Sequence, residues 1–183
     1  MEYLLKNGDS VYIRETEEKD AEVLLNILDK TSRETKFLSR NPGEIVISDC
    51  TIDIEKRMID NIKSDNTHFW FAVEYNGEVV GQCSVRLMRN SQRYLHRAEL
   101  GFMLLEKACN IGIGGKMMIH CLNKCREIGV LQAELLVVSN NERALNMYKS
   151  FGFEVVGTIP RALKYLDGTF ATEYKMIKFL DKE

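Results

Sequence analysis

The sequence predicts a mixed α/β fold (α+β, with a mixed sheet): one domain over residues 1–183, with about seven strands and helices on both faces of the sheet. Strand and helix patterns alternate along the chain in the order β-α-α-β-β-β-α-β-α-β-β. Asn76-Gly77 and Asp167-Gly168 are hairpin turns, so the strands on either side of each must pair antiparallel. A strand–helix–strand unit in the middle of the chain implies a parallel crossover.

The first half of the chain carries short strands and two amphipathic helices. Residues 11–14 predict a strand, and apolar residues at helical spacing predict helices over 18–33 and 52–62. The aromatic and β-branched segment His68–Tyr75 predicts a strand, and residues 78–88 form the returning strand of its hairpin.

The second half begins with a strand over 97–105 and the clearest helix of the chain, over 112–129. Its apolar stripe consists of Met117, Met118, Cys121, Leu122, Cys125 and Ile128. Residues 131–138 are mostly apolar, which is typical of a strand covered on both faces. The remaining segments are a helix over 141–150 and strands over 154–166 and 169–180.

Composition and charge exclude several classes of partner. The net charge is −2, and the sequence shows neither a long run of like charges nor a basic stripe, so nucleic acid is not expected as a partner. Residues 1–10 lack the apolar segment of a signal peptide, and no apolar stretch approaches the roughly 18 residues of a membrane span. We therefore expect a cytoplasmic protein that does not bind membranes.

Five cysteines are scattered without a Cys-x-x-Cys pair or a Cys/His zinc spacing, so no metal is expected. Their odd number favours reduced, mostly buried thiols in a reducing compartment. Cys121 and Cys125 share one helix face, where we expect them to pack in the core. His68, His96 and His120 show no spacing that suggests catalysis or metal binding.

A glycine-rich turn, residues 109–116, lies between a strand and the 112–129 helix. Its three glycines leave the amides at the helix start uncovered, and these amides with the helix dipole make an anion site that suits a pyrophosphate. The alternative is a tight turn that only begins a helix. A P-loop would need Gly-Lys-Ser/Thr, and a dinucleotide fingerprint would need glycine where Met117 stands, so both matches fail.

At this point the sequence resembles the GNAT acetyltransferases. The family's central signature, Gln/Arg-x-x-Gly-x-Gly/Ala, matches at Gly112 and Gly114, although Cys109 stands at the Gln/Arg position. Residues 141–153 resemble the family's Asn-x-x-Ala-x-x-hydrophobic-Tyr-x-x-x-Gly-Phe run, and 98–101 match just upstream of the turn. Each motif is weak alone, but three in order with the right separations are specific.

The resemblance implies transfer of an acetyl group from acetyl-coenzyme A to a primary amine of an unidentified small molecule or peptide, by direct attack. Backbone amides of Met103 and Leu105 are expected to meet the pantetheine arm and the thioester oxygen. The other residues expected to bind the cofactor are Cys109, Asn110, Gly112, Ile113, Gly114, Gly115, Lys116 and Asn141. Asn141 has an alternative role as a helix N-cap.

Two side chains are candidates for catalysis. Glu99 lies on a predicted strand face with Gly101 and Met103, and the resemblance implies a general base there, acting directly or through water. Its alternative role is a solvated surface carboxylate. The resemblance implies that Tyr148 is the general acid for the coenzyme A thiolate, and its alternative role is packing on an amphipathic helix.

Several questions stay open at the level of sequence. In the family, acceptor choice comes largely from the segment that joins the first helices and from the last hairpin, with Arg33, Phe37, Arg40, Arg161 and Tyr165 as candidates here. A coenzyme A-binding sensor or scaffold without turnover is the alternative function, and a longer acyl group is a third option. A homodimer is possible, since the terminal hairpin offers a free edge.

Overall fold

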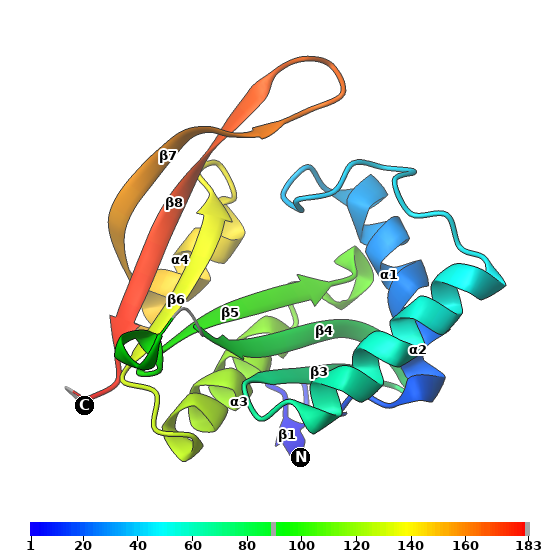
Figure 1. The fold of residues 1–183 in the computed structure, drawn as a ribbon, viewed down its shortest axis with the longest axis horizontal. Helices are drawn as coiled ribbons and strands as arrows, with labels where there is room; N and C mark the ends of the chain where they lie inside the picture. Colours follow the sequence, from blue (N-terminus) through cyan, green and yellow to red (C-terminus); the bar gives the residue numbers. More distant parts are fainter. Residues whose placement is uncertain (89–90, 182–183) are drawn as a thin grey trace.

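The computed structural model describes residues 1–88 and 91–181. Over those residues it contains one sheet of eight strands, in the order β1-β2-β3-β4-β5-β6-β8-β7 (Figure 1). The strands are β1 (Glu2–Leu4), β2 (Ser10–Glu15), β3 (His68–Tyr75), β4 (Glu78–Leu87), β5 (Arg97–Leu104), β6 (Gln132–Val138), β7 (Glu154–Lys164) and β8 (Phe170–Phe179). The helices are α1 (Ala21–Glu34), α2 (Asp49–Ser64), α3 (Ile113–Glu127) and α4 (Glu142–Ser150).

This arrangement confirms the mixed sheet with helices on both faces, and it adds one strand, β1, at the edge. β1 is only three residues long, too short for a periodic pattern in the sequence. It pairs antiparallel with β2, and a 2.9 Å hydrogen bond between the Tyr3 hydroxyl and His120 Nδ1 ties it to α3. The strand therefore depends on a tertiary contact.

The pairing of β5 with β6 determines where the sheet opens. These strands are parallel, and only three residues of each are paired: Arg97–Glu99 of β5 with Gln132–Glu134 of β6. Beyond Glu99 and Glu134 the two strands diverge, although β5 continues to Leu104 and β6 to Val138. Their carboxyl-terminal halves are the two sides of a V-shaped opening (Figure 1).

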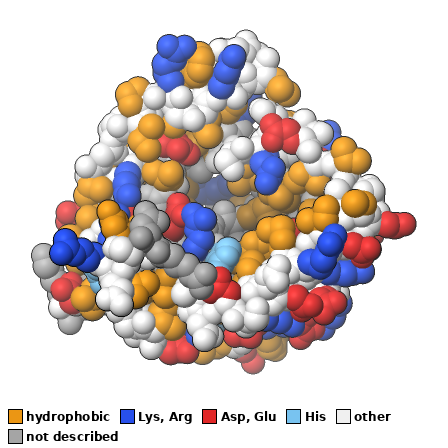
Figure 2. Space-filling model, viewed as in Figure 1, with side chains coloured by type: hydrophobic (Ala, Val, Ile, Leu, Met, Phe, Trp, Pro, Cys, Tyr) orange, Lys and Arg blue, Asp and Glu red, His pale blue; other side chains and the backbone are white. Residues whose placement is uncertain are grey.

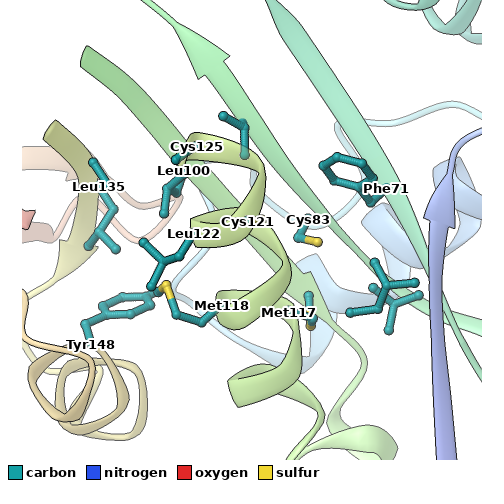
Figure 3. Close-up of a cluster of buried hydrophobic side chains, with 14 of the residues drawn as sticks. Phe71, Cys83, Leu100, Met117, Met118, Cys121, Leu122, Cys125, Leu135 and Tyr148 are labelled. Carbon is teal, nitrogen blue, oxygen red and sulfur yellow. The ribbon is translucent and has the colours of Figure 1, made fainter. Parts of the chain in front are cut away.

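The main core lies between the sheet and the face of α3 that the sequence predicted. Met117, Met118, Cys121 and Cys125 are at most 1% exposed. They pack among side chains of β3, β4 and β5, as Figure 3 shows. Tyr148 of α4 borders the same cluster. On the opposite face, Ala21, Leu24 and Ile59 of the first two helices form a smaller cluster with Trp70 and Val79.

Candidate functional site

A cleft of about 420 Å³ lies in the opening between β5 and β6. It draws its lining from five parts of the chain: the end of α1 with the segment after it, β5, the glycine-rich turn with the first turns of α3, β6, and α4 with its cap. Figure 2 shows the molecule hollowed between the arm that carries the β7–β8 hairpin and the arm that carries α1 and α2. Strand divergence therefore produces a pocket at the place where the glycine turn begins α3.

The glycine turn begins α3 without a side-chain cap. Gly112 is the residue before α3 and has φ +94°, a conformation that side chains other than glycine rarely adopt. No side chain caps the first amides of α3, and the first intrahelical bond is Lys116 N to the Gly112 carbonyl at 3.3 Å. A Cβ at Gly114 would lie 3.1 Å from Met147 Sδ of α4. The amides before Lys116 are thus uncovered at one end of the cleft.

Backbone bonding of β5 decides which of its amides face the cleft. The Met88 amide donates to the Arg97 carbonyl at 3.0 Å, and the Leu105 amide donates to the Val80 carbonyl at 2.9 Å. Opposed residues in an antiparallel ladder alternate between bonded and unbonded pairs, and the register is regular from Leu87–Ala98 to Gly81–Leu104. The odd-numbered residues of β5 therefore bond to β4.

The amides of Phe102 and Leu104 consequently point to the open edge of β5. The expectation for the Leu105 amide is wrong, because that amide is already bonded to Val80, and the same ladder directs the Met103 amide towards β4. Alternation in the sequence predicts which side chains share a face. It does not reveal which amides face an adjacent strand, since that depends on register.

Tyr148 lines the cleft from α4. Its side chain is 7% exposed and packs against Phe102, with 5.9 Å between ring centroids, and against Phe153 at 6.2 Å. Burial, with a smaller contribution from Cys121, raises the pKa of the Tyr148 hydroxyl to about 12. The phenol is therefore protonated at neutral pH and is available as a hydrogen-bond donor.

Glu99 lies one residue before the β5 segment that lines the cleft. Its carboxylate forms an ion pair with Arg86 of β4, and both residues line a neighbouring pocket with Asp65, Thr67, His68, Leu87 and Met88. The Glu99 side chain is 34% exposed, so water can reach it. The structure therefore places Glu99 beside the cleft, at the point where β5 and β6 separate.

Glu134 of β6 is almost fully buried, at 1% exposed. The sequence pattern gave no sign of a role for this residue. Arg97 of β5 hydrogen-bonds to its Oε1, and the Lys175 ammonium of β8 lies 2.7 Å from its Oε2. The Lys175 contact is an ion pair to an oxygen that is itself buried. These ion pairs join three strands at the base of the V.

The remaining predicted binding residues divide into two groups. Met103, Cys109, Asn110, Gly112, Gly114, Gly115 and Asn141 line the cleft. Ile113 is fully buried in the core, Leu105 is 5% exposed, and neither these two nor Lys116 is part of the lining. Asn141 also has its alternative role, because its Oδ1 accepts a 3.2 Å hydrogen bond from the Ala144 amide and caps α4.

Comparison with known proteins gives the family. Residues 13–172 match the family model described as the acetyltransferase (GNAT) domain, which is most of the chain. The chain belongs to the GNAT acetyltransferase family.

Two curated relatives illustrate how far the sequence likeness extends. This GNAT chain is 30% identical over 84 residues to the L-amino acid N-acetyltransferase AaaT of Escherichia coli K12, covering 45% of this chain and 51% of that protein. It is 34% identical over 86 residues to N-alpha-acetyltransferase 50 of Danio rerio, covering 46% and 50%. The chain thus spans about half the length of the curated relatives it matches.

Solved structures confirm the GNAT fold. A GNAT acetyltransferase from Streptococcus pneumoniae superposes with a TM-score of 0.84 at 23% identity, over 93% of this chain and 99% of that one. The yncA structure of Salmonella typhimurium, solved with its cofactor acetyl-CoA, has a TM-score of 0.80 at 17% identity, over 94% and 95%.

Several residues of this GNAT cleft were not predicted from sequence. Among them are Thr31, Thr35, Leu38, Arg143 and Met147. Phe37, an acceptor-site candidate, does line the cleft. Arg143 and Met147 lie inside the motif run over residues 141–153, so their positions on α4 offered a signal. Thr31, Thr35 and Leu38 offered none, because nothing in their pattern shows that α1 ends opposite the sheet opening.

Within residues 1–88 and 91–181, no three His, Cys, Asp or Glu side chains gather closely enough to hold a metal ion. In the same part of the chain, none of the helices combines the length and apolar character that a membrane crossing requires.

Proposed function

We propose that this GNAT domain transfers an acetyl group from acetyl-coenzyme A to a primary amine of a small molecule or peptide, by direct attack of the amine on the thioester. The observation that carries the proposal is the position of the uncovered α3 amides at one end of the cleft between β5 and β6. That arrangement suits an elongated ligand with a diphosphate at one end and a reactive group in the opening.

The chain's groups fit such a ligand along its length. Amides at the start of α3 would hold the diphosphate, and glycine at 114 keeps the approach free of a Cβ. The open-edge amides of Phe102 and Leu104 would donate hydrogen bonds to the carbonyl groups of the pantetheine arm. The arm would then pair with the free edge of β5 as an additional strand would. When bound, the thioester supplies an acyl group with a thiolate as its leaving group.

Glu99 is the proposed general base. It lies beside the β5 segment that lines the cleft and is partly exposed, so a water molecule can relay a proton from the amine to its carboxylate. Arg86 holds the carboxylate by its ion pair and thereby limits its rotamers. Removal of the proton makes the amine lone pair available for attack on the acyl carbon.

Tyr148 is the proposed general acid. Its hydroxyl is protonated at neutral pH, and its ring is fixed by Phe102 and Phe153. A hydrogen bond from this hydroxyl to the departing sulfur stabilises the negative charge that develops there. Because the pKa of the phenol, about 12, is above the roughly 8.5 of an ordinary thiol, full proton transfer is unfavourable and Tyr148 acts chiefly through this hydrogen bond.

The test is release of thiol from acetyl-coenzyme A with a panel of amines that includes amino acids, polyamines and short peptides. We expect thiol release that depends on one class of amine and yields the N-acetyl product in equal amount. Tight binding of acetyl-coenzyme A without release with any amine would contradict the proposal and support a non-catalytic binding module. Propionyl- and longer acyl-coenzyme A in the same assay define the acyl group.

A further inference from the structure

A second groove continues from the cleft towards the tip of the β7–β8 hairpin. It has a volume of about 600 Å³ and shares Thr35 and Leu38 with the cleft lining. One wall is residues 32–36 and 38–42, from the end of α1 onwards, and the other is residues 162–167 of the hairpin. A ligand in the groove can therefore continue into the cleft past these two shared residues.

The two walls are joined at one point although they are far apart in the sequence. The Tyr165 hydroxyl donates a 3.0 Å hydrogen bond to the Lys36 carbonyl, and the Lys36 ammonium lies 5.5 Å from the centroid of the Tyr165 ring. Figure 1 shows the hairpin turn and the segment after α1 facing each other across the opening. The groove thus has two defined sides.

Cations outnumber carboxylates along this groove, although the whole chain has a net charge of −2. The cationic lining residues are Arg33, Lys36, Arg40 and Lys164, and the acidic ones are Glu34 and Asp167.

Both acidic groups accept hydrogen bonds from backbone amides and keep their charge, and Arg33 forms an ion pair with Asp29, so Arg40 and Lys164 are the cations left to meet a ligand. Glu34 Oε2 accepts from the Glu106 amide at 2.9 Å, and Asp167 Oδ1 accepts from the Thr169 amide at 2.9 Å. The Lys36–Asp167 ion pair is 3.7 Å long and well exposed, so it holds Lys36 only weakly. Arg40 and Lys164 are exposed on opposite walls.

We propose that this groove binds acidic residues of a peptide whose amine is acetylated in the adjoining cleft. The inference rests on the proposed function and specifies its substrate class. An extended chain advances about 3.3 Å per residue, so the groove suits residues that follow the acetylated one. Arg40 and Lys164 line the groove and not the cleft, so the proposed contacts are with residues that follow the acetylated one.

The test compares three peptides that share the same N-terminal residue and continue with Glu-Glu, Gln-Gln or Lys-Lys. We expect kcat/KM to be about tenfold higher for Glu-Glu than for Lys-Lys at low ionic strength, falling to about twofold near 0.5 M salt as the charges are screened. The double variant R40E/K164E should reverse the order. Lys6→Glu, an exposed reversal outside both linings, should keep it.

The outcomes separate this inference from the proposed function. Equal turnover of the three peptides would overturn the inference while leaving acetyl transfer intact. A loss of acetyl-coenzyme A affinity in R40E/K164E would also overturn it, because the groove would then serve the nucleotide. If no peptide is acetylated, fluorescence anisotropy of labelled peptides decides: acidic binding that R40E/K164E abolishes supports the groove assignment, and equal binding of all three overturns it.

Discussion

Glu99 and Glu134 are register partners on the parallel strands β5 and β6, and they form the last pair before the strands diverge. Residues paired in this way project from the same face of a sheet, so the proposed base stands next to a buried carboxylate. Arg86 pairs with Glu99, whereas Arg97 and Lys175 pair with Glu134. Without these cations the two neighbouring negative charges would repel each other at the base of the V.

Glu134→Gln should destabilise the fold in a pH-dependent way. Burial opposes ionisation of Glu134, but Arg97 and Lys175 outweigh it, so its pKa lies below the ordinary value. A lowered folded-state pKa contributes stability above the unfolded pKa of about 4.3, which is lost as pH falls through the folded value. We expect the free energy of unfolding to drop by about 2 kcal/mol at pH 7.

Urea unfolding at pH 7 and near pH 3.5 measures this effect. Glu78→Gln is the control, because Glu78 and its partner Lys107 are both exposed and should contribute little. The difference between wild type and Glu134→Gln should shrink at the lower pH. A difference that is the same at both pH values would contradict the assignment of stability to the ionised carboxylate.

Glu99→Gln should slow the chemical step without unfolding the protein. Loss of a general base costs about a hundredfold in kcat. The defect should shrink as pH rises, because a larger fraction of the acceptor amine is then neutral without help from the enzyme. Steady-state kinetics from pH 6.5 to about 9.5 test both points. A kcat within about threefold of wild type, below the usual cost of losing a base, would remove Glu99 from the mechanism.

Tyr148→Phe keeps the ring that packs against Phe102 and removes only the hydroxyl. We expect kcat to fall at least about tenfold, with cofactor affinity nearly unchanged. A thioester whose leaving thiol is more acidic should narrow the gap, since that sulfur needs less stabilisation. Tyr12→Phe, at an exposed tyrosine on β2, is the control. If kcat of wild type and kcat of Tyr148→Phe depend equally on the acidity of the leaving thiol, Tyr148 has a packing role alone.

Thiol reactivity should report on the cleft. Cys83, Cys121 and Cys125 are buried, and burial raises the pKa of the Cys125 thiol to about 12, so all three should react slowly. Exposed Cys50 should react fastest. Cys109 lines the cleft, so acetyl-coenzyme A should protect it. Peptide mass spectrometry after timed labelling checks the order, and equal labelling of Cys109 with and without cofactor would place the ligand elsewhere.

The fold follows from the sequence wherever a local pattern determines the structure. Asn76-Gly77 forms its predicted turn because both residues adopt positive φ, at 52° and 78°, and the apolar stripe of α3 packs on the sheet as expected. β1 and the register of β5 depend on contacts between distant segments, so local patterns could not predict them. The resemblance pointed to both walls of the basic groove, and Arg33, Arg40 and Tyr165 do line it, but local patterns could not show that the walls meet.

The most direct test of the account is calorimetric titration of wild type and Gly114→Ala with acetyl-coenzyme A and with acetyl-pantetheine, which lacks the diphosphate. An added Cβ would lie 3.1 Å from Met147 Sδ at the uncovered start of α3. We predict that wild type binds acetyl-coenzyme A at least about a hundredfold more tightly than acetyl-pantetheine, and that Gly114→Ala loses most of this difference. Equal affinity of wild type for the two ligands would contradict a diphosphate site at α3.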